Sequence, residues 1–361
     1  FSDLGQFNAD ISSWDTSSVT TMTFMFRMAY AFNQPLSSLD TSSVKDMKYM
    51  FQYARAFNQS LSFDTSSVTS MRSMFQEADA FNQPLNLDTS SVKDLEEMFY
   101  LVDAFNQPLS FDTSSVTTMS AMFDMSSAAG PDPCSRRRLS FGPAFNSPVN
   151  FWDTSRVTSM HGMFRHASGF NQPVNFDTSR VTDMSEMFQG ASAFNEPLSF
   201  DTSRVIDMAA MFAQASALNK PLSFATSRVT DMSSMLQQAT AFNQPLDFDT
   251  SRVTDMSSML QGAISFDQPL YFDFSSVIDM TCMLATTSCT GDPWGRRRRA
   301  LSDSCIVEDE PLVFNHPITL GTTKRVTDLT GMFAGSKFNQ PVSLDTSGVT
   351  SMKAMFRQAI D

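Results

Sequence analysis

Histidine and cysteine are scarce in this 361-residue sequence, with three and four copies. The chain also has no Gly-rich phosphate loop, no GxSxG nucleophile motif and no CxxC pair. His161 and His166 lie five residues apart, which is not the i,i+4 spacing that puts two metal ligands on one helix face. We therefore expect no enzymatic activity, no catalytic residues and no cofactor.

Long apolar runs and an excess of basic residues are absent as well. No stretch approaches the roughly 18 apolar residues of a membrane-spanning helix. The net charge is −13, which argues against nucleic acid as a partner because that role needs a basic stripe. The sequence has no initiator Met, no signal-like segment and no polar capping unit at either end. We expect an excerpt of a longer protein, without membrane insertion in this segment.

What the sequence does contain is one repeated unit. A Phe-Asn pair, or a close variant of it, recurs every 24 or 25 residues except at two inserts. It opens thirteen units, at Phe7, Phe32, Phe57, Phe81, Phe105, Phe145, Phe170, Phe194, Leu218, Phe242, Phe266, Phe314 and Phe338. We therefore predict a single array over residues 1–361.

The two inserts, residues 126–143 and 286–311, are rich in Gly, Pro and Arg and read as exposed loops. Their arginine runs, Arg136–Arg138 and Arg296–Arg299, are docking patches, protease sites or insertions without a role. Cys289 and Cys305 bracket the second insert. The sequence leaves open whether they pair, which would indicate an oxidising compartment.

Each unit combines two apolar spacings. Leu109 and Phe111 alternate as in a short strand, whereas Val116, Met119 and Met122 have helical spacing. We predict a repeat solenoid, leucine-rich-repeat-like: a right-handed stack of short parallel strands with short helical or irregular return segments. One unit cannot bury its own apolar face, but stacked units can. The Met columns should then fill the core, and the Asn column should form a hydrogen-bonded ladder.

The unit resembles a known family. FNQPLSFDTSSVTTMSAMF at Phe105–Phe123 is similar to the repeat of BspA-like leucine-rich-repeat surface proteins, in the subfamily described as a domain of unknown function. The likeness covers the chain except for the inserts, with local departures at Ala225, Leu218 and Gly321–Val326. It implies a secreted or cell-surface protein engaged in adhesion and protein contacts, without enzymatic activity.

Two rows adjoin the strand. An Asp at unit position 8 recurs, for example at Asp64, Asp177, Asp201 and Asp249. At a spacing of about 4.8 Å these carboxylates repel one another, so they either cap the following Thr-Ser turn or share Ca²⁺, for which Asp177 and Asp201 are the candidates. The Thr that follows serves the turn or presents a flat array to ice or mineral.

A basic row occupies position 11 in the middle of the chain, where earlier units have Ser. An Asp follows three residues later in four of these units. We expect a solvated ion-pair lattice, worth about 0.2–1 kcal/mol per exposed pair; the alternative is a sulfate or phosphate groove. The row comprises Arg156, Arg180, Arg204, Arg228 and Arg252.

The residue between the Leu and Phe of each strand should point outward and form the candidate binding face. Its members include Ser110, Asn175, Ser199, Ser223, Asp247 and Tyr271. We predict an extracellular or cell-surface scaffold that binds protein or glycan along this face. The alternatives are an ion-, mineral- or ice-contacting array of Asp-Thr rows, and a structural spacer or filament that self-associates end to end.

Overall fold

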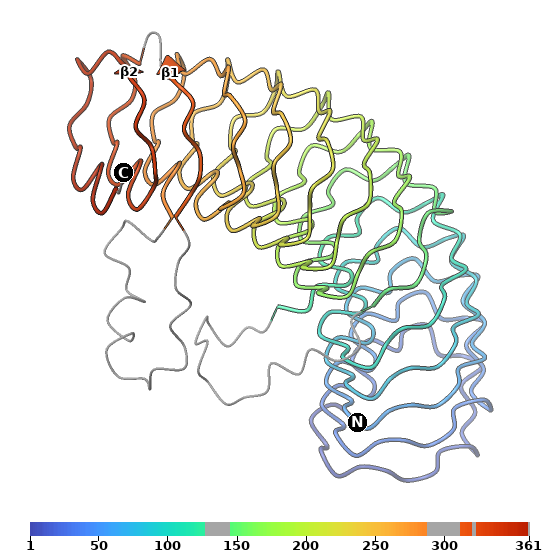
Figure 1. The fold of residues 1–361 in the computed structure, drawn as a ribbon. Coiled ribbons are helices and arrows are strands. Elements are labelled where there is room, and N and C mark those ends of the chain that lie inside the picture. Colours follow the sequence, from blue (N-terminus) through green and yellow to red (C-terminus); the bar gives the residue numbers. More distant parts are fainter. Residues whose placement is uncertain (127–144, 287–310, 320–322, 360–361) are drawn as a thin grey trace, which may run out of the picture. The chain divides into compact units, whose positions relative to one another are not determined.

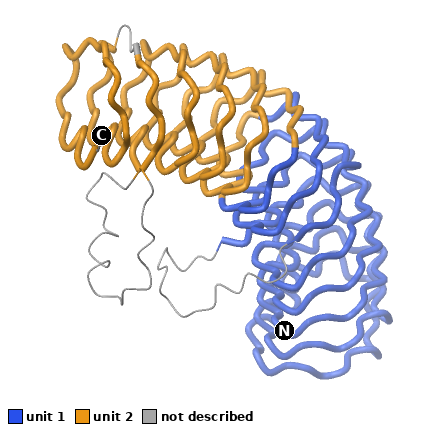
Figure 2. The backbone as a smooth tube through the Cα atoms, in the orientation of Figure 1, with its two compact units in different colours: residues 1–181, 190–196 blue, residues 182–189, 197–361 orange. Residues whose placement is uncertain are grey.

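The chain winds through successive coils of one repeat each. The computed structural model describes residues 1–126, 145–286, 311–319 and 323–359 (Figure 1). The coils form two compact units, one of Phe1–Val181 and Gly190–Glu196, the other of Thr182–Gln189 and Pro197–Asp361 (Figure 2). Among the described residues no helix has the length and apolar character needed to cross a membrane.

Parallel pairing joins each coil to the next. In the second unit, β1 (Ile318–Thr319) pairs with β2 (Val342–Ser343) in parallel, with Ile318 opposite Val342. Elsewhere in the described residues the pairing consists of single parallel bridges, such as Asp46 with Ser70 in the first unit and Asp207 with Asp231 in the second. Pairing therefore follows rows of single residues more than extended strands.

The return segment of each coil is built from turns, and the described residues contain no α-helix. Met50 donates its N–H to the Met47 carbonyl and closes a turn, whereas Phe51 donates to Met74 in the next coil. Tyr49, which lies inside the turn that Met47 and Met50 close, has a left-handed φ of 57°. Such a φ is uncommon for a residue other than Gly. The three-residue spacing that suggested a helix thus comes from consecutive turns, the irregular alternative of our expectation.

Aromatic rings stack along the core. In the first unit, Phe51 and Phe75 from adjacent coils lie 5.5 Å apart at 5°, and Phe51 lies 4.1 Å from Phe57 of the following coil. Distances of this kind suit offset stacking, which adds about 0.5–1.5 kcal/mol per pair beyond area burial. Met50 and Met74 have no exposed surface. The predicted role of the Met columns as core filling is confirmed.

The Asn column forms the predicted ladder. The backbone N–H of Asn58 donates to the side-chain Oδ1 of Asn33 at 3.0 Å, and Asn82 repeats this with Asn58 at 3.0 Å. Gln83 adds its Nε2 to the same Asn58 oxygen at 3.0 Å. These carboxamides are therefore engaged in holding one coil to the next.

Cys282 is buried in the second unit and is disulfide-bonded. The other three cysteines, Cys134, Cys289 and Cys305, lie outside the described residues, as do most residues of both inserts and their arginine runs. The question of a Cys289–Cys305 pair therefore lies outside them too.

A buried ion pair connects the two coils on either side of the first insert. The Asp124 carboxylate, whose side chain is 1% exposed, lies 2.7 Å from Arg165 Nη2. Ser126 also donates its N–H to Asp124, and its hydroxyl accepts from Arg165. Burial raises the pKa of Asp124, and the Arg165 contact opposes that shift. Arg165 thus compensates a carboxylate that has little access to water.

Replacing Arg165 with Met should destabilise the chain by about 3–5 kcal/mol, because the buried carboxylate then loses its partner. The matched control is Arg27→Met, which removes an exposed pair with Asp3 and should cost less than about 1 kcal/mol. Urea denaturation of both variants measures the difference. Equal losses would contradict the assigned role of the buried pair.

A cluster of acidic residues near Arg55 contains a carboxyl with a raised pKa. Asp79 is half-buried, and burial raises its pKa to about 6, with Asp103 and Glu77 adding to the shift and Arg55 opposing it. Because the folded chain holds this proton more tightly than the unfolded chain does, the contribution to stability is complete below about pH 3.8 and is lost as the pH rises through about 6.

Asp79→Asn should therefore gain stability relative to the parent chain as the pH rises from about 4 to 7. Asp64→Asn is the control, since hydrogen bonds from Ser66 lower the pKa of Asp64. It should lose stability relative to the parent chain as the pH rises toward about 3.8 and change little from about 4 to 7. Denaturation midpoints at several pH values measure both differences. A pH-independent difference for Asp79→Asn would contradict the assignment.

Candidate functional site

The candidate binding face consists of the six predicted residues between Leu and Phe, and all six are exposed. The local reason is the two-residue alternation of an extended segment. Leu222 and Phe224 are buried at 4% and 7% exposure, whereas Ser223 between them and Ala225 after them are exposed. Ser110 and Asn175 belong to the first unit, and the other four residues to the second.

Tyr271 stands out on this face. Its side chain is 80% exposed, the highest value among the large apolar side chains of the described residues. Tyr271 lies one repeat after Asp247, which itself follows Ser223 by one repeat. The second unit therefore presents hydroxyl, carboxylate and aromatic groups in consecutive coils.

The Asp at position 8 caps its own turn. Asp249 accepts the N–H of Ser251 at 3.1 Å and its hydroxyl at 2.6 Å. These bonds, the hydroxyl first, lower the pKa of Asp249, and Arg252 adds a smaller effect. Asp177 and Asp201, in different units, each accept the N–H of the Ser two residues on at 3.0 Å.

No group of three or more His, Cys, Asp and Glu suited to a metal ion occurs within the part of the chain that the structure describes. The Ser donors described above account for Asp177, Asp201 and Asp249 as turn caps.

The Thr row is not available for surface contact. Thr202 is fully buried and donates its hydroxyl to the Ala225 carbonyl at 3.1 Å; Thr89 is 1% exposed and bonds the Asp112 carbonyl. The alternative of a flat Asp-Thr array facing ice or mineral is therefore wrong for these Thr residues. A different row, at position 13, is exposed and includes Thr230. The sequence carries no signal that separates the two rows before the burial of the turn is known.

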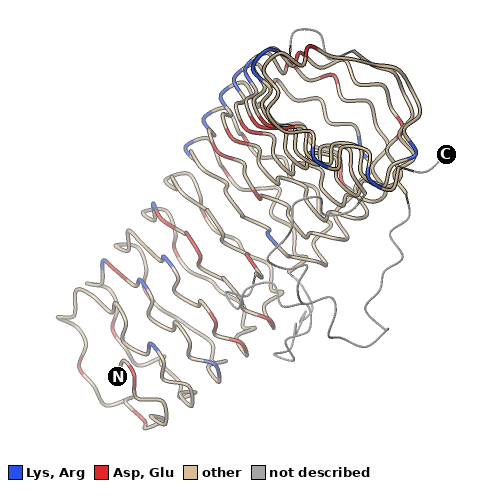
Figure 3. Cartoon of the chain, turned by 90° about the vertical axis from the view of Figure 1, so that its left-hand side faces the viewer, with Lys and Arg blue, Asp and Glu red and all other residues tan. Residues whose placement is uncertain are grey.

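The basic row is exposed, with Arg156 and Arg180 in the first unit and the other three in the second. None of the five forms an ion pair within 4.0 Å with any described residue. The expected ion-pair lattice is therefore absent there. One reason is that the neighbouring Asp side chains serve their own turns: Asp231 accepts the N–H of Ser233 at 2.8 Å. Figure 3 shows basic and acidic residues of the second unit in separate stripes.

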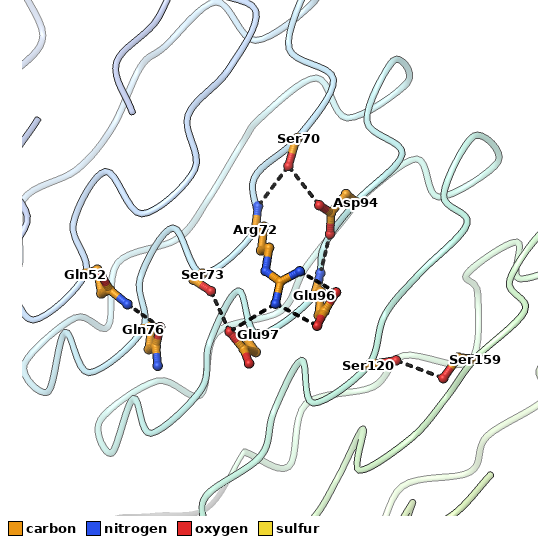
Figure 4. A network of polar contacts seen from close by, with 10 residues as sticks. All are labelled: Gln52, Ser70, Arg72, Ser73, Gln76, Asp94, Glu96, Glu97, Ser120 and Ser159. Carbon is orange, nitrogen blue, oxygen red and sulfur yellow. Dashed lines mark hydrogen bonds and ion pairs between the residues drawn. The ribbon is translucent and has the colours of Figure 1, made fainter. Parts of the chain in front are cut away.

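The first unit contrasts with this arrangement. There Arg72 lies 2.9 Å from Glu96 of the next coil, and Ser73 donates its hydroxyl to Glu97 at 2.8 Å (Figure 4). Gln52 donates its Nε2 to Gln76 Oε1 at 2.6 Å, a separate pair that also joins two coils. These side chains cross-link coils and are engaged with one another.

The comparisons identify a family. A family model described as "Mycoplasma protein of unknown function, DUF285" matches the chain in overlapping segments, residues 1–86, 61–133, 136–246, 198–293 and 306–361. Recurrent matches of one model along a chain are the mark of a repeat protein. The comparison with curated proteins found no match, and neither did the comparison with solved structures.

Adding about 1 mM Ca²⁺ after EDTA treatment should leave the thermal unfolding midpoint unchanged, because the turn carboxylates already accept Ser donors. A site filled at 100 times its dissociation constant would add about 2.7 kcal/mol and be visible. An upward shift that disappears in Asp177→Asn or Asp201→Asn would contradict the capping role.

Proposed function

From the premise that this chain belongs to the DUF285 family of mycoplasma proteins of unknown function, we propose that it is a BspA-like, leucine-rich-repeat-like solenoid without enzymatic activity. Its role is that of an extracellular or cell-surface scaffold that binds another macromolecule along the candidate binding face, with glycan as the first class to test and protein as the second.

The observation that carries this proposal is a division among the polar rows. Three polar rows form hydrogen bonds that join or close coils: the Asn ladder, the turn Asp residues and the buried Thr row. By contrast, the Tyr271 ring is exposed, and the basic row forms no ion pair with any described residue. Exposed aromatic and arginine side chains of this kind are enriched where proteins bind partners.

The disulfide at Cys282 supports the extracellular location. Disulfides persist in secreted and surface proteins, whereas reducing systems keep most cytosolic thiols free. An oxidising, extracellular compartment and an exposed aromatic and basic surface both agree with a cell-surface binding scaffold.

A purely structural spacer or filament is the second candidate. A spacer needs one uniform face. Here position 11 is Ser in the early units and Arg in the middle units, and the candidate binding face of small polar residues contains Tyr271. These differences favour binding over a spacer.

The test is binding of the chain to a panel of immobilised oligosaccharides. For the oligosaccharides that the parent chain binds, Tyr271→Ala should weaken the affinity by about tenfold, the effect expected from the loss of one stacked ring. Tyr271→Phe should keep the affinity of the parent chain. Phe24→Ala, which removes a 42% exposed ring from the first unit, is the matched control. Equal binding by Tyr271→Ala and the parent chain would contradict the proposed face.

A further inference from the structure

One turn of the second unit keeps its geometry without its capping carboxylate. Ala225 stands where the neighbouring coils have Asp201 and Asp249. The turn still closes, since Val229 donates its N–H to Thr226 at 2.9 Å. The Thr226 hydroxyl also donates to the next coil, at 3.0 Å from the Asp249 carbonyl. The backbone is therefore arranged as if the Asp were present.

The missing carboxylate leaves donors without an acceptor. In the adjacent coil Ser251 gives both its N–H and its hydroxyl to Asp249. The corresponding Ser227 is exposed, and neither its N–H nor its hydroxyl bonds to any residue that the structure describes. In the adjacent coil both Ser251 donors meet on a carboxylate, whereas Ala225 supplies none to the surface-exposed Ser227.

The surrounding charge is mixed: the turn carboxylates Asp201 and Asp249 of the adjacent coils flank this place, and the arginine row runs beside it. Arg228 follows Ser227 directly and lies between Arg204 and Arg252 of the adjacent coils, because Asp231 pairs with both Asp207 and Asp255. Coils paired in this way are about 4.8 Å apart. Arg204 and Arg252 each have a turn carboxylate in their own coil: hydrogen bonds from Ser203 and Ser251 lower the pKa of Asp201 and Asp249, and each Arg adds a smaller lowering effect. Arg228 has none, since its own turn carries Ala225.

We propose that the Ala225 turn binds a carboxylate group of an acidic glycan. The ligand carboxylate takes the position of the absent Asp side chain and accepts the Ser227 N–H, the Ser227 hydroxyl and the Arg228 guanidinium. This assignment deepens the proposed function and rests on it, since it names the ligand class of the same face.

The surface around the turn favours a glycan over an acidic peptide. Ser223 lies two residues before Ala225 on the same exposed face, Asp247 one coil away and Tyr271 one coil further. Hydroxyl and carboxylate groups suit sugar hydroxyls, and the exposed ring suits the apolar face of a sugar. Protein interfaces are instead centred on buried apolar anchors, whereas this surface offers one isolated ring.

The decisive variant is Ala225→Asp, which supplies the carboxylate from the chain itself. Its affinity for tri-galacturonate should fall by about tenfold to a hundredfold, the effect of losing charge-assisted hydrogen bonds. Its fold should persist, because Asp is the residue of the neighbouring turns. Arg228→Ser, which installs the residue of the early units, should also weaken binding. Calorimetry measures both.

The converse variant is Asp201→Ala, which frees Ser203 beside Arg204 and should create a second site, raising the number of tri-galacturonate molecules bound per chain from one to two. Asp64→Ala is its matched control, because Ser67 stands there in place of the Arg, and it should create none.

The outcomes separate this inference from the proposed function. Unchanged tri-galacturonate affinity in Ala225→Asp would overturn the inference, and the proposed function would stand if Tyr271→Ala still weakened glycan binding. Tri-glutamate binding as tight as tri-galacturonate binding would overturn the assignment to glycans. Absence of binding to every glycan tested would overturn the inference and leave protein as the ligand class of the proposed scaffold.

Discussion

The structure depends on the inability of one coil to bury its own Phe and Met side chains. The core side chains complete their packing against neighbouring coils, as the stacking of Phe51 on both Phe75 and Phe57 shows. The repeat length and the identity of the core positions follow from that requirement. The arrangement of polar residues also follows from it, because stacking places equivalent residues of successive coils next to each other at the spacing of paired strands.

Rows of identical polar groups need compensation, and the chain supplies it locally. Asn side chains accept from the next backbone, and turn Asp residues accept from Ser two positions on. Carboxylates that repel along a row therefore serve as turn caps, each engaged by the Ser of its own turn. The residues that escape this pattern, Tyr271, Arg228 and Ala225, lie on exposed parts of the second unit. Function is most readily carried by such departures, since the repeat itself is committed to the fold.

The sequence allowed the core and the outward strip to be predicted, because Phe, Met and Leu-x-Phe recur at fixed phase. The sequence pattern did not distinguish a helix from consecutive turns, because apolar residues three positions apart occur in both. The left-handed φ of Tyr49 and its equivalents produces the turns. The burial of Thr202 and the unpaired state of Arg204 depend on how the turn folds inward and on which donors the nearby Asp accepts. The Ala225 departure was visible in the sequence, but its meaning required the Asp–Ser bonds of the neighbouring coils.

The most direct test of the account is a crystal structure of the chain soaked with tri-galacturonate. We expect a ligand carboxylate within hydrogen-bonding distance of the Ser227 N–H and the Arg228 guanidinium, with sugar rings extending toward Tyr271. A carboxylate bound elsewhere, with the Ala225 turn left empty, would contradict it.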